Sequence, residues 1–444
     1  MLDICKKLVQ EALCQGADAA DCIASATEGI SADIYDGQVD SFQKSQTQGI
    51  GLRVLRQGRV GYAYTERLEG AERIVTQALS AAEVTDRDEY ACIYQAAQHY
   101  ASEQPEQTDL SPAVSQQVVD KALALYHAVM ALPHIENVQG CSAEVEKTYV
   151  YFANSAGTEG SASRQNTALF VDAVAKIGDW TDSGWAFAIG KTLEEVDEHQ
   201  VAQQAQEKAI QYYQAERAQN GAMPVIFHGR AMVDLLGAFA PIFSAERAQK
   251  GMSQLSGKQG QKIAADCVTI VDTPDHPQLG PGLPFDGEGV PTGVHTLVDH
   301  GVLKTLLYSL SSAKQDGVQS TGHGRRGYSG QVTIAPHVFT VQPGTQTLAE
   351  LCAAAGRGVV IYEVSGLHAG VNDVSGDFSL LCKGRLIENG TEGRAVEQMV
   401  VSGNFFAMLQ AILALGSDTQ YSIPGGSCYA SPSVYVKELA IAGN

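Results

Sequence analysis

The chain has 444 residues, 44% of them hydrophobic, and a formal net charge of −20 at pH 7. This length is too great for one ordinary hydrophobic core, so two domains are expected. Because the acidic charge is spread along the chain, binding to nucleic-acid phosphates or to an anionic membrane surface is not expected. No apolar run reaches the roughly 18 to 20 residues of a membrane span, and the N-terminus lacks a signal-peptide pattern. A cytoplasmic location is therefore expected.

The nine cysteines form no Cys-x-x-Cys pair. An odd number in a cytoplasmic chain indicates reduced, buried side chains rather than a disulfide framework. Cys382 and Cys428 stay open as functional candidates because each lies near a cluster of glycines.

In the first half, helical periodicity alternates with strand-like alternation of apolar and polar residues. Helices are predicted at 2–16, 68–85, 111–131 and 192–216, and strands within 20–67, 136–152 and 166–189. Turns are predicted at Asp36-Gly37, Gln48-Gly49 and Gln57-Gly58. The pattern indicates antiparallel strands covered by helices.

The second half is richer in glycine and in alternating segments, and residues 217–224 separate it from the first. Tight hairpins are predicted at His300-Gly301 and Asn389-Gly390, and helices at 229–246 and 404–415, the second capped by Asn404. The apolar surface of that second helix indicates deep burial or a subunit contact. The predicted fold class is α+β with two domains: residues 1–220, and a second domain rich in sheet or sandwich structure, residues 221–444.

Four segments in this order carry a family resemblance: PVIFHGRAMVDLLGAF, LVDHGVLKTLLYSLSSAKQDGVQSTGHGRR, GVNDVSGDFSLLCKGRLIENG and SVYVKELAIAG. Over essentially the whole chain, the sequence resembles the PmbA/TldE branch of the TldD/PmbA (modulator of DNA gyrase) family. The resemblance implies a cytoplasmic two-subunit assembly in which a TldD-type subunit is a zinc peptidase acting on unstructured peptides.

The catalytic branch of that family carries HExxxH on the helix after the first strand of the second domain, where two histidines bind zinc and the glutamate acts as base. The corresponding positions here are Gly237, Ala238 and Ile242, and none can bind zinc. Pro241 would also disturb a helix at this point. His228, just upstream, is interpreted as a solvated histidine at a surface turn.

The loop HAGVNDVSGDF, from His368 to Phe378, is the first candidate site. Its glycines would let a peptide backbone approach, while its polar side chains offer hydrogen bonds. The predicted substrate-binding residues are Gly370, Asn372, Asp373, Ser375, Gly376 and Asp377. The preceding strand VVIYEV could add a peptide as an extra strand. An equally weighted alternative is that the loop only turns the chain between strands.

The segment STGHGRRGYSG, residues 320–330, is the second candidate. Arg325 and Arg326 could clamp a peptide carboxylate or pair with a partner subunit, although surface ion pairs are the commoner role of adjacent arginines. Any titration of His323, in the same segment, is interpreted as incidental to function.

The favoured hypothesis is a TldE-like subunit that has no cofactor of its own, shapes the substrate chamber and pairs with a zinc-bearing TldD-type peptidase. Alone, such a chain is expected to form a homodimer. One alternative is a self-standing metal-dependent peptidase using Cys428, His368 and the acids of 372–377. Another is a non-enzymatic protein that binds a topoisomerase or a toxin–antitoxin component.

Overall fold

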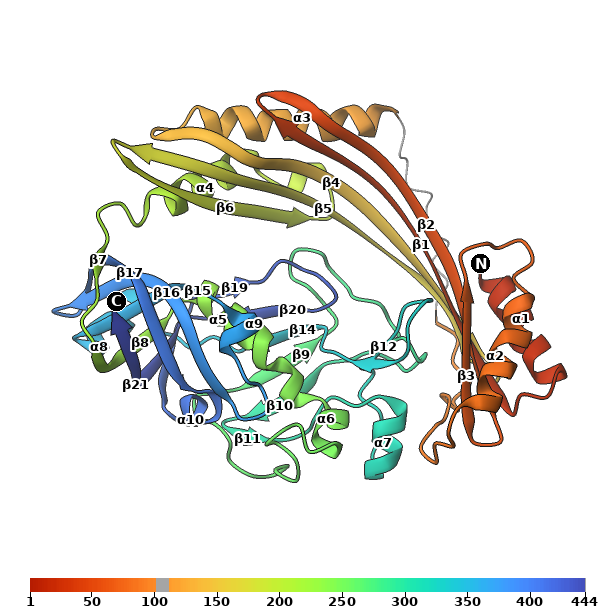
Figure 1. The fold of residues 1–444 in the computed structure, drawn as a ribbon. Coiled ribbons are helices and arrows are strands. Elements are labelled where there is room, and N and C mark those ends of the chain that lie inside the picture. Colours follow the sequence, from red (N-terminus) through yellow and green to blue (C-terminus); the bar gives the residue numbers. More distant parts are fainter. Residues whose placement is uncertain (101–111, 444) are drawn as a thin grey trace. The chain divides into compact units, whose positions relative to one another are not determined.

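The computed structural model describes residues 1–100 and 112–443 (Figure 1). The chain forms two compact units. The first unit contains residues 1–210, 274–293 and 308–333. The second unit contains residues 211–273, 294–307 and 334–444. This division differs from the predicted one at residue 220 because two segments of the second half belong to the first unit.

A six-stranded antiparallel sheet forms the first unit, in the order β3-β2-β1-β4-β5-β6. Its strands are β1 (Ala19–Tyr35), β2 (Gln38–Arg56), β3 (Arg59–Thr65), β4 (Ile135–Asn154), β5 (Glu159–Ile177) and β6 (Trp180–Gly190). The predicted turns at Asp36-Gly37 and Gln57-Gly58 are confirmed, and both residues of each turn have positive φ, as tight hairpins require.

The predicted turn at Gln48-Gly49 is wrong, because β2 continues through it. The glycine serves close packing instead. A Cβ at Gly49 would lie 2.3 Å from the ring of Tyr328, so a larger residue there would displace this ring.

Four helices cover one face of this sheet: α1 (Leu2–Cys14), α2 (Arg73–Val84), α3 (Pro112–Met130) and α4 (Glu198–Ile210), the last preceded by the 3-10 turn η1 (Leu193–Glu195). The helices α1 and α2 pack at one end of the strands, and α3 and α4 at the other (Figure 1). Alternate strand residues such as Cys22, Ile30 and Val171 form the buried core beneath them. The predicted helices are therefore confirmed at shorter bounds; residue 111 of the third lies outside the described residues.

Two segments from later in the chain complete the first unit. They contain the helix α7 (Leu310–Asp316) and the short strand β12 (Gly324–Arg325), which is hydrogen-bonded to β13 (Thr333–Ile334). Ser309 caps α7 by accepting the backbone N–H of Ser312 at 3.3 Å.

The second unit contains a sheet that closes on itself. Its strands are β7 (Glu216–Arg217), β8 (Gly221–Phe227), β15 (Gly358–Ser365), β16 (Asp377–Glu388), β17 (Thr391–Asn404), β18 (Ile412–Leu415) and β21 (Val434–Gly443). Closure results because β21 pairs with both β8 and β17. The predicted hairpin at Asn389-Gly390 joins β16 to β17 and is confirmed.

A second sheet of this unit has the order β11-β10-β9-β14-β20-β19. Its strands are β9 (Ile270–Thr273), β10 (His295–Asp299), β11 (Val302–Leu303), β14 (Val338–Val341), β19 (Gln420–Tyr421) and β20 (Cys428–Ser431). The helical elements of the unit are α5 (Gly229–Phe239), η2 (Ala240–Phe243), α6 (Ala245–Gln249), α8 (Leu348–Ala355), α9 (Leu367–Gly370) and α10 (Phe405–Gln410). The predicted α+β class is confirmed.

Two predicted helices of the second half are too long. The first ends at Phe239 because Pro241 cannot continue it, and a 3-10 turn follows. The second ends at Gln410, and Ile412–Leu415 forms β18, which pairs with β21. The predicted cap is confirmed, since Asn404 Oδ1 accepts the N–H of Ala407 at 3.2 Å. Among the described residues, no helix has the length and apolar character to cross a membrane.

Candidate functional site

The loop from Val371 to Gly376 connects α9 to β16 and is held by its own polar groups. Asn372 Oδ1 accepts the backbone N–H groups of Val374 and Ser375, both at 3.1 Å, which forms an Asx turn. Gly376 has φ +85°, a conformation that favours glycine. The sequence thus specifies the shape of this loop locally.

Two side chains from the region after α5 fix the loop from outside. Arg247 on α6 donates from Nη2 to Asp373 Oδ2 at 2.5 Å, and both side chains are half-buried. Gln254 donates from Nε2 to the carbonyl oxygens of Ser375, at 2.9 Å, and Val374, at 3.3 Å. Asp373 therefore has a cationic partner within the second unit.

The C-terminal side of the loop is held by Asn404. Its Nδ2 donates to the carbonyl of Ser375 and to Asp377 Oδ1, both at 2.9 Å. Ser375 Oγ donates to Asp377 Oδ2, also at 2.9 Å. Hydrogen bonds from Asn404 and Ser375 lower the pKa of Asp377, which favours the ionised carboxylate.

The predicted substrate-binding residues of this loop are thus brought together, but their side chains bond mainly to one another. A Cβ at Gly370 would lie 2.2 Å from the carbonyl of Ser379, so this glycine allows close packing onto β16. Peptide contacts by the loop stay a prediction. Strand addition along the first half of VVIYEV is wrong, because Val359–Ile361 pairs with both β8 and β16; for residues 362–364 it stays a prediction.

The start of α5 carries an aromatic and cationic cluster. His228 caps the helix, accepting the N–H of Arg230 on Nδ1 at 3.2 Å, and its ring stacks on Tyr362 with centroids 4.6 Å apart. The Arg230 guanidinium lies 5.3 Å from the centre of the same ring. The interpretation of His228 as a solvated surface histidine is therefore wrong: it has a capping and packing role.

The three positions that correspond to the zinc motif lie on α5 and the turn after it. A Cβ at Gly237 would lie 3.1 Å from two ring carbons of Tyr429, and Ile242 is fully buried. With Ala238 between them, these positions supply no donor atom, and Tyr429 covers the space beside Gly237. The residues present do not fit a zinc ion.

The residues considered as alternative metal ligands differ in their exposure to solvent. His368 is exposed on α9, whereas Cys428 is buried on β20 with its Sγ 3.7 Å from the carbonyl of Ser422. Within the described ranges, no group of three ligand atoms includes either residue together with Asp373 or Asp377.

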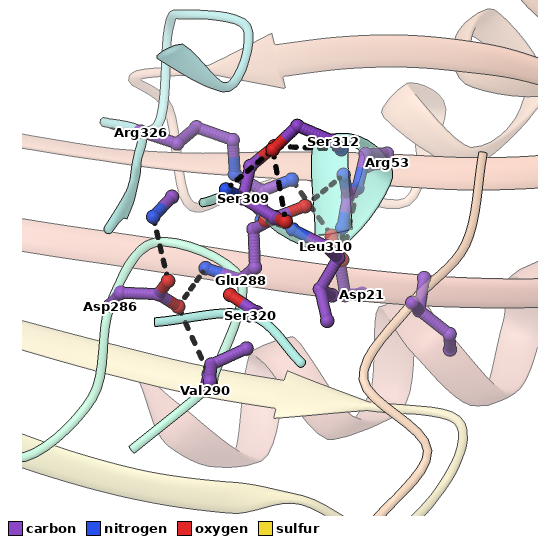
Figure 2. A network of polar contacts seen from close by, with 12 residues as sticks. Asp21, Arg53, Asp286, Glu288, Val290, Ser309, Leu310, Ser312, Ser320 and Arg326 are labelled. Atoms are coloured by element: carbon purple, nitrogen blue, oxygen red, sulfur yellow. Dashed lines mark hydrogen bonds and ion pairs between the residues drawn. The ribbon is translucent and has the colours of Figure 1, made fainter. Parts of the chain in front are cut away.

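Arg326 of the first unit has a different environment from the predicted one. Its side chain is fully buried, and Nη1 lies 2.8 Å from Asp21 Oδ1. Arg53 Nη2 lies 2.5 Å from the other oxygen of Asp21, and Arg53 Nη1 lies 2.9 Å from Glu288 Oε1 (Figure 2). Burial acts to raise the pKa of Asp21, but the charges of Arg326 and Arg53 outweigh it and hold this pKa below its usual value.

The same network, which we call the Asp21 cluster, extends into the segment 274–293. Glu288 Oε2 accepts the N–H of Leu310 at 2.8 Å. Asp286 accepts three backbone N–H groups, from Glu288, Val290 and Gly324, at 2.9, 3.0 and 2.8 Å (Figure 2). Burial and the charge of Glu288 raise the pKa of Asp286 to about 7.

The Asp21 cluster holds two later segments of the chain against β1 and β2. Because Arg326 is buried in it, the prediction that Arg326 clamps a peptide at the surface is wrong. Arg325 is exposed, and its predicted role stays untested. His323 is buried, with Nδ1 2.9 Å from Thr321 Oγ1.

Three models of one family match the chain. They are the PmbA/TldA metallopeptidase C-terminal domain, the metallopeptidase domain 1 and the metallopeptidase central domain, at residues 220–443, 20–82 and 108–212. The C-terminal model alone spans half of the chain. The chain therefore belongs to the PmbA/TldA metallopeptidase family, as the resemblance predicted.

Individual relatives agree with this family. The metalloprotease PmbA of Escherichia coli O157:H7 is 26% identical over 438 residues, which cover 96% of this chain and 92% of that protein. A crystal structure from Thermotoga maritima, described as a modulator of a DNA gyrase, has a TM-score of 0.88 at 29% identity, with 99% of each chain covered. TldE from Thermococcus kodakarensis has a TM-score of 0.89 at 22% identity, covering 99% of this chain and 100% of that one, and shows the fold alone.

Proposed function

We propose that this chain is the non-catalytic, TldE-like subunit of a cytoplasmic two-subunit peptidase that degrades or processes unstructured peptides. Its partner would be a TldD-type subunit that carries HExxxH and the zinc ion. In that assembly this chain shapes the substrate chamber and does not cleave the peptide bond itself. In the absence of the partner it would form a homodimer.

The observation that carries the proposal is the chemistry of the zinc-motif positions. Hydrolysis at such a site needs two histidine ligands and a carboxylate that takes a proton from water. Here the positions hold Gly237, Ala238 and Ile242. The ring of Tyr429 packs against Gly237, so a side chain at position 237 would require this ring to shift by a few tenths of an ångström, and this packing supports the proposal that position 237 holds no metal ligand.

The loop 371–376 supports a shaping role rather than a reacting one. Its acidic side chains are already engaged, Asp373 by the Arg247 guanidinium and the adjoining Asp377 by Ser375 and Asn404, so neither is placed as a free general base. Its exposed part includes Val374, whose side chain is 41% exposed and available for contact with an apolar peptide side chain. A loop that is already held by its own hydrogen bonds can position a flexible substrate with little further loss of its conformational entropy on binding.

The proposal is tested by incubating a fluorogenic unstructured peptide with the purified chain, with a TldD-type subunit, and with their mixture. Cleavage by the mixture well above the sum of the separate rates is the expected result. Cleavage by the chain alone, abolished by Cys428→Ser or His368→Ala, would instead establish the self-standing peptidase. If the mixture is no faster than the TldD-type subunit, the chamber-shaping role is refuted and the interaction-protein hypothesis gains support.

A further inference from the structure

A block of four side chains lies on the face of the first unit's sheet that carries no helix. Phe170 on β5 is opposite Phe187 on β6, and Asp172 is opposite Trp185. Their neighbours Leu169, Val171 and Ala186 are buried beneath α3 and α4. Because successive strand residues point to opposite faces, all four side chains of the block point away from the helices.

The three aromatic rings of the block form one platform. Trp185 is stacked with Phe170 and with Phe187, at centroid distances of 6.4 and 6.1 Å and interplanar angles of 28° and 23°. Trp185 is 46% exposed. Exposed, ordered aromatic rings of this kind are typical of cation-binding surfaces, because the ring face carries negative electrostatic potential.

Asp172 stands within this platform without a partner. Its Oδ1 is covered and makes no hydrogen bond, and no ion pair to Asp172 occurs among residues 1–100 and 112–443. Burial raises the pKa of this carboxyl, and no neighbouring charge opposes the effect. An uncompensated carboxylate destabilises the folded chain, and such groups are concentrated at functional sites.

The basic residues around the block do not neutralise Asp172. Lys176, further along β5, pairs with Glu136 at 2.7 Å. Lys208 on α4 donates to the carbonyl of Trp185 at 2.9 Å, and its Nζ lies 4.8 Å from the centre of the indole ring. The second contact shows that the Trp185 ring accepts a cation, while the carboxylate beside it has none.

On its other side, Asp172 lies opposite a residue without a side chain. Its neighbour on β4 is Gly140, where a Cβ would come within 3.4 Å of the Phe170 ring. Asp172 itself is partly exposed. The Phe170 ring therefore extends over Gly140, and the exposed part of Asp172 is where a compact cation can approach the carboxylate.

We propose that Asp172, Trp185 and the flanking phenylalanines bind a primary ammonium group of the peptide substrate. The ammonium would donate hydrogen bonds to the Asp172 carboxylate and lie against the indole ring. It can come from a lysine side chain or from the peptide's N-terminus. The identification of the ligand as a peptide rests on the proposed function, whereas the affinity for an ammonium rests on the block alone.

Trp185 supplies a direct readout, because Trp180→Phe leaves it as the one tryptophan of the chain. Its emission is followed in the full chain while three matched probes are added. Nα-acetyl-lysine methylamide carries a side-chain ammonium, norleucine methylamide carries an N-terminal one, and Nα-acetyl-norleucine methylamide is neutral. Saturable binding of either ammonium probe, but not of the neutral one, is expected, and the better ligand identifies the source.

Asp172→Asn removes the charge and keeps the volume, so it should weaken ammonium binding by about tenfold to a hundredfold. Its thermal midpoint should not fall, because the variant removes a partly buried carboxylate that has no ion pair. Asp179→Asn, in the exposed turn between β5 and β6, is the matched control and should leave affinity unchanged. Phe187→Leu, which keeps Trp185 as reporter, should also weaken binding and serves if Asp172→Asn does not fold.

Equal responses to all three probes, or unchanged affinity in both Asp172→Asn and Phe187→Leu, would overturn the site. The failure of the proposed function is a separate result. Ammonium binding without any gain in peptide cleavage by the mixture would refute the subunit role and leave the site standing. If the mixture cleaves the peptide, Asp172→Asn does not alter this cleavage and no probe binds, the ammonium site is refuted and the subunit role stands.

Discussion

Removing the carboxylate of Asp21 should destabilise the first unit more than most single substitutions. In Asp21→Asn, the guanidinium groups of Arg53 and Arg326 lose the carboxylate that they share. Arg53 keeps its ion pair with Glu288. Arg326 already has two buried nitrogen atoms without a partner. Removing one partner of a buried ion pair costs about 3–5 kcal/mol, because the charge left behind stays buried.

The two tryptophans make this prediction measurable for one unit. Both Trp180 and Trp185 lie on β6, so urea denaturation followed by tryptophan emission reports the first unit. When the same emission is followed during thermal denaturation, we expect the midpoint to fall by roughly 6–20 °C, taking about 2–4 °C per kcal/mol for a unit of this size. Glu72→Gln removes the exposed ion pair with Lys7 and is the matched control, with no measurable change expected. A loss below about 1 kcal/mol in Asp21→Asn would show that the Asp21 cluster does not hold this unit together.

Three further predictions concern other parts of the molecule. Asn404→Ala should cost about 1–2 kcal/mol, because it removes a helix cap and the hydrogen bonds to Ser375 in the loop 371–376 and to Asp377 beside it, and faster amide hydrogen exchange confined to that region would confirm it. The pKa of Asp286 is raised from 3.8 to about 7 in the folded chain, so its contribution to stability is present below pH 4 and is lost as the pH rises through 7. Unfolding at pH 5 and pH 8 should therefore show a smaller pH dependence in Asp286→Asn than in the parent, and equal slopes would contradict this. Gly237→His should destabilise by about 1–3 kcal/mol through overlap with Tyr429, and adding Tyr429→Ala should recover part of the loss in thermal denaturation. If Gly237→His is as stable as the parent, the packing argument against a metal on α5 fails.

Local signals in the sequence were sufficient for much of the fold. Asp36-Gly37 and Asn389-Gly390 predicted their hairpins because tight turns require positive φ, which these residue pairs tolerate. Asn404 predicted its helix cap for a similarly local reason. The strand β18 was missed because an apolar run of this length has no period that distinguishes a buried helix from a buried strand.

The Asp21 cluster required information that no local pattern contains. Counting back from the Asp36-Gly37 turn places Leu52 opposite Asp21, but a β-bulge between Asp33 and Ile34 shifts the register by one residue and places Arg53 there. Arg326 joins from a segment about 300 residues away along the chain. Arg326 therefore could not be distinguished from exposed Arg325 without the tertiary structure.

The loop 371–376 was found from its composition, but its role was not. Asparagine, serine and glycine have the same turn-forming chemistry whether a loop binds a ligand or supports itself. The partner that decides the matter, Arg247, lies far away in sequence. Asp172 was missed for a related reason, since its importance comes from the missing cation and from Trp185 on the neighbouring strand.

The central claim is that the partner subunit, and not this chain, carries out hydrolysis. The most direct test mixes this chain with a TldD-type subunit in which the glutamate of HExxxH is replaced by glutamine, and measures cleavage of an unstructured peptide. The account predicts no cleavage by this mixture and full activity when the unmodified TldD-type subunit is used. Cleavage that persists with the modified subunit would place a working catalytic centre in this chain and contradict the account.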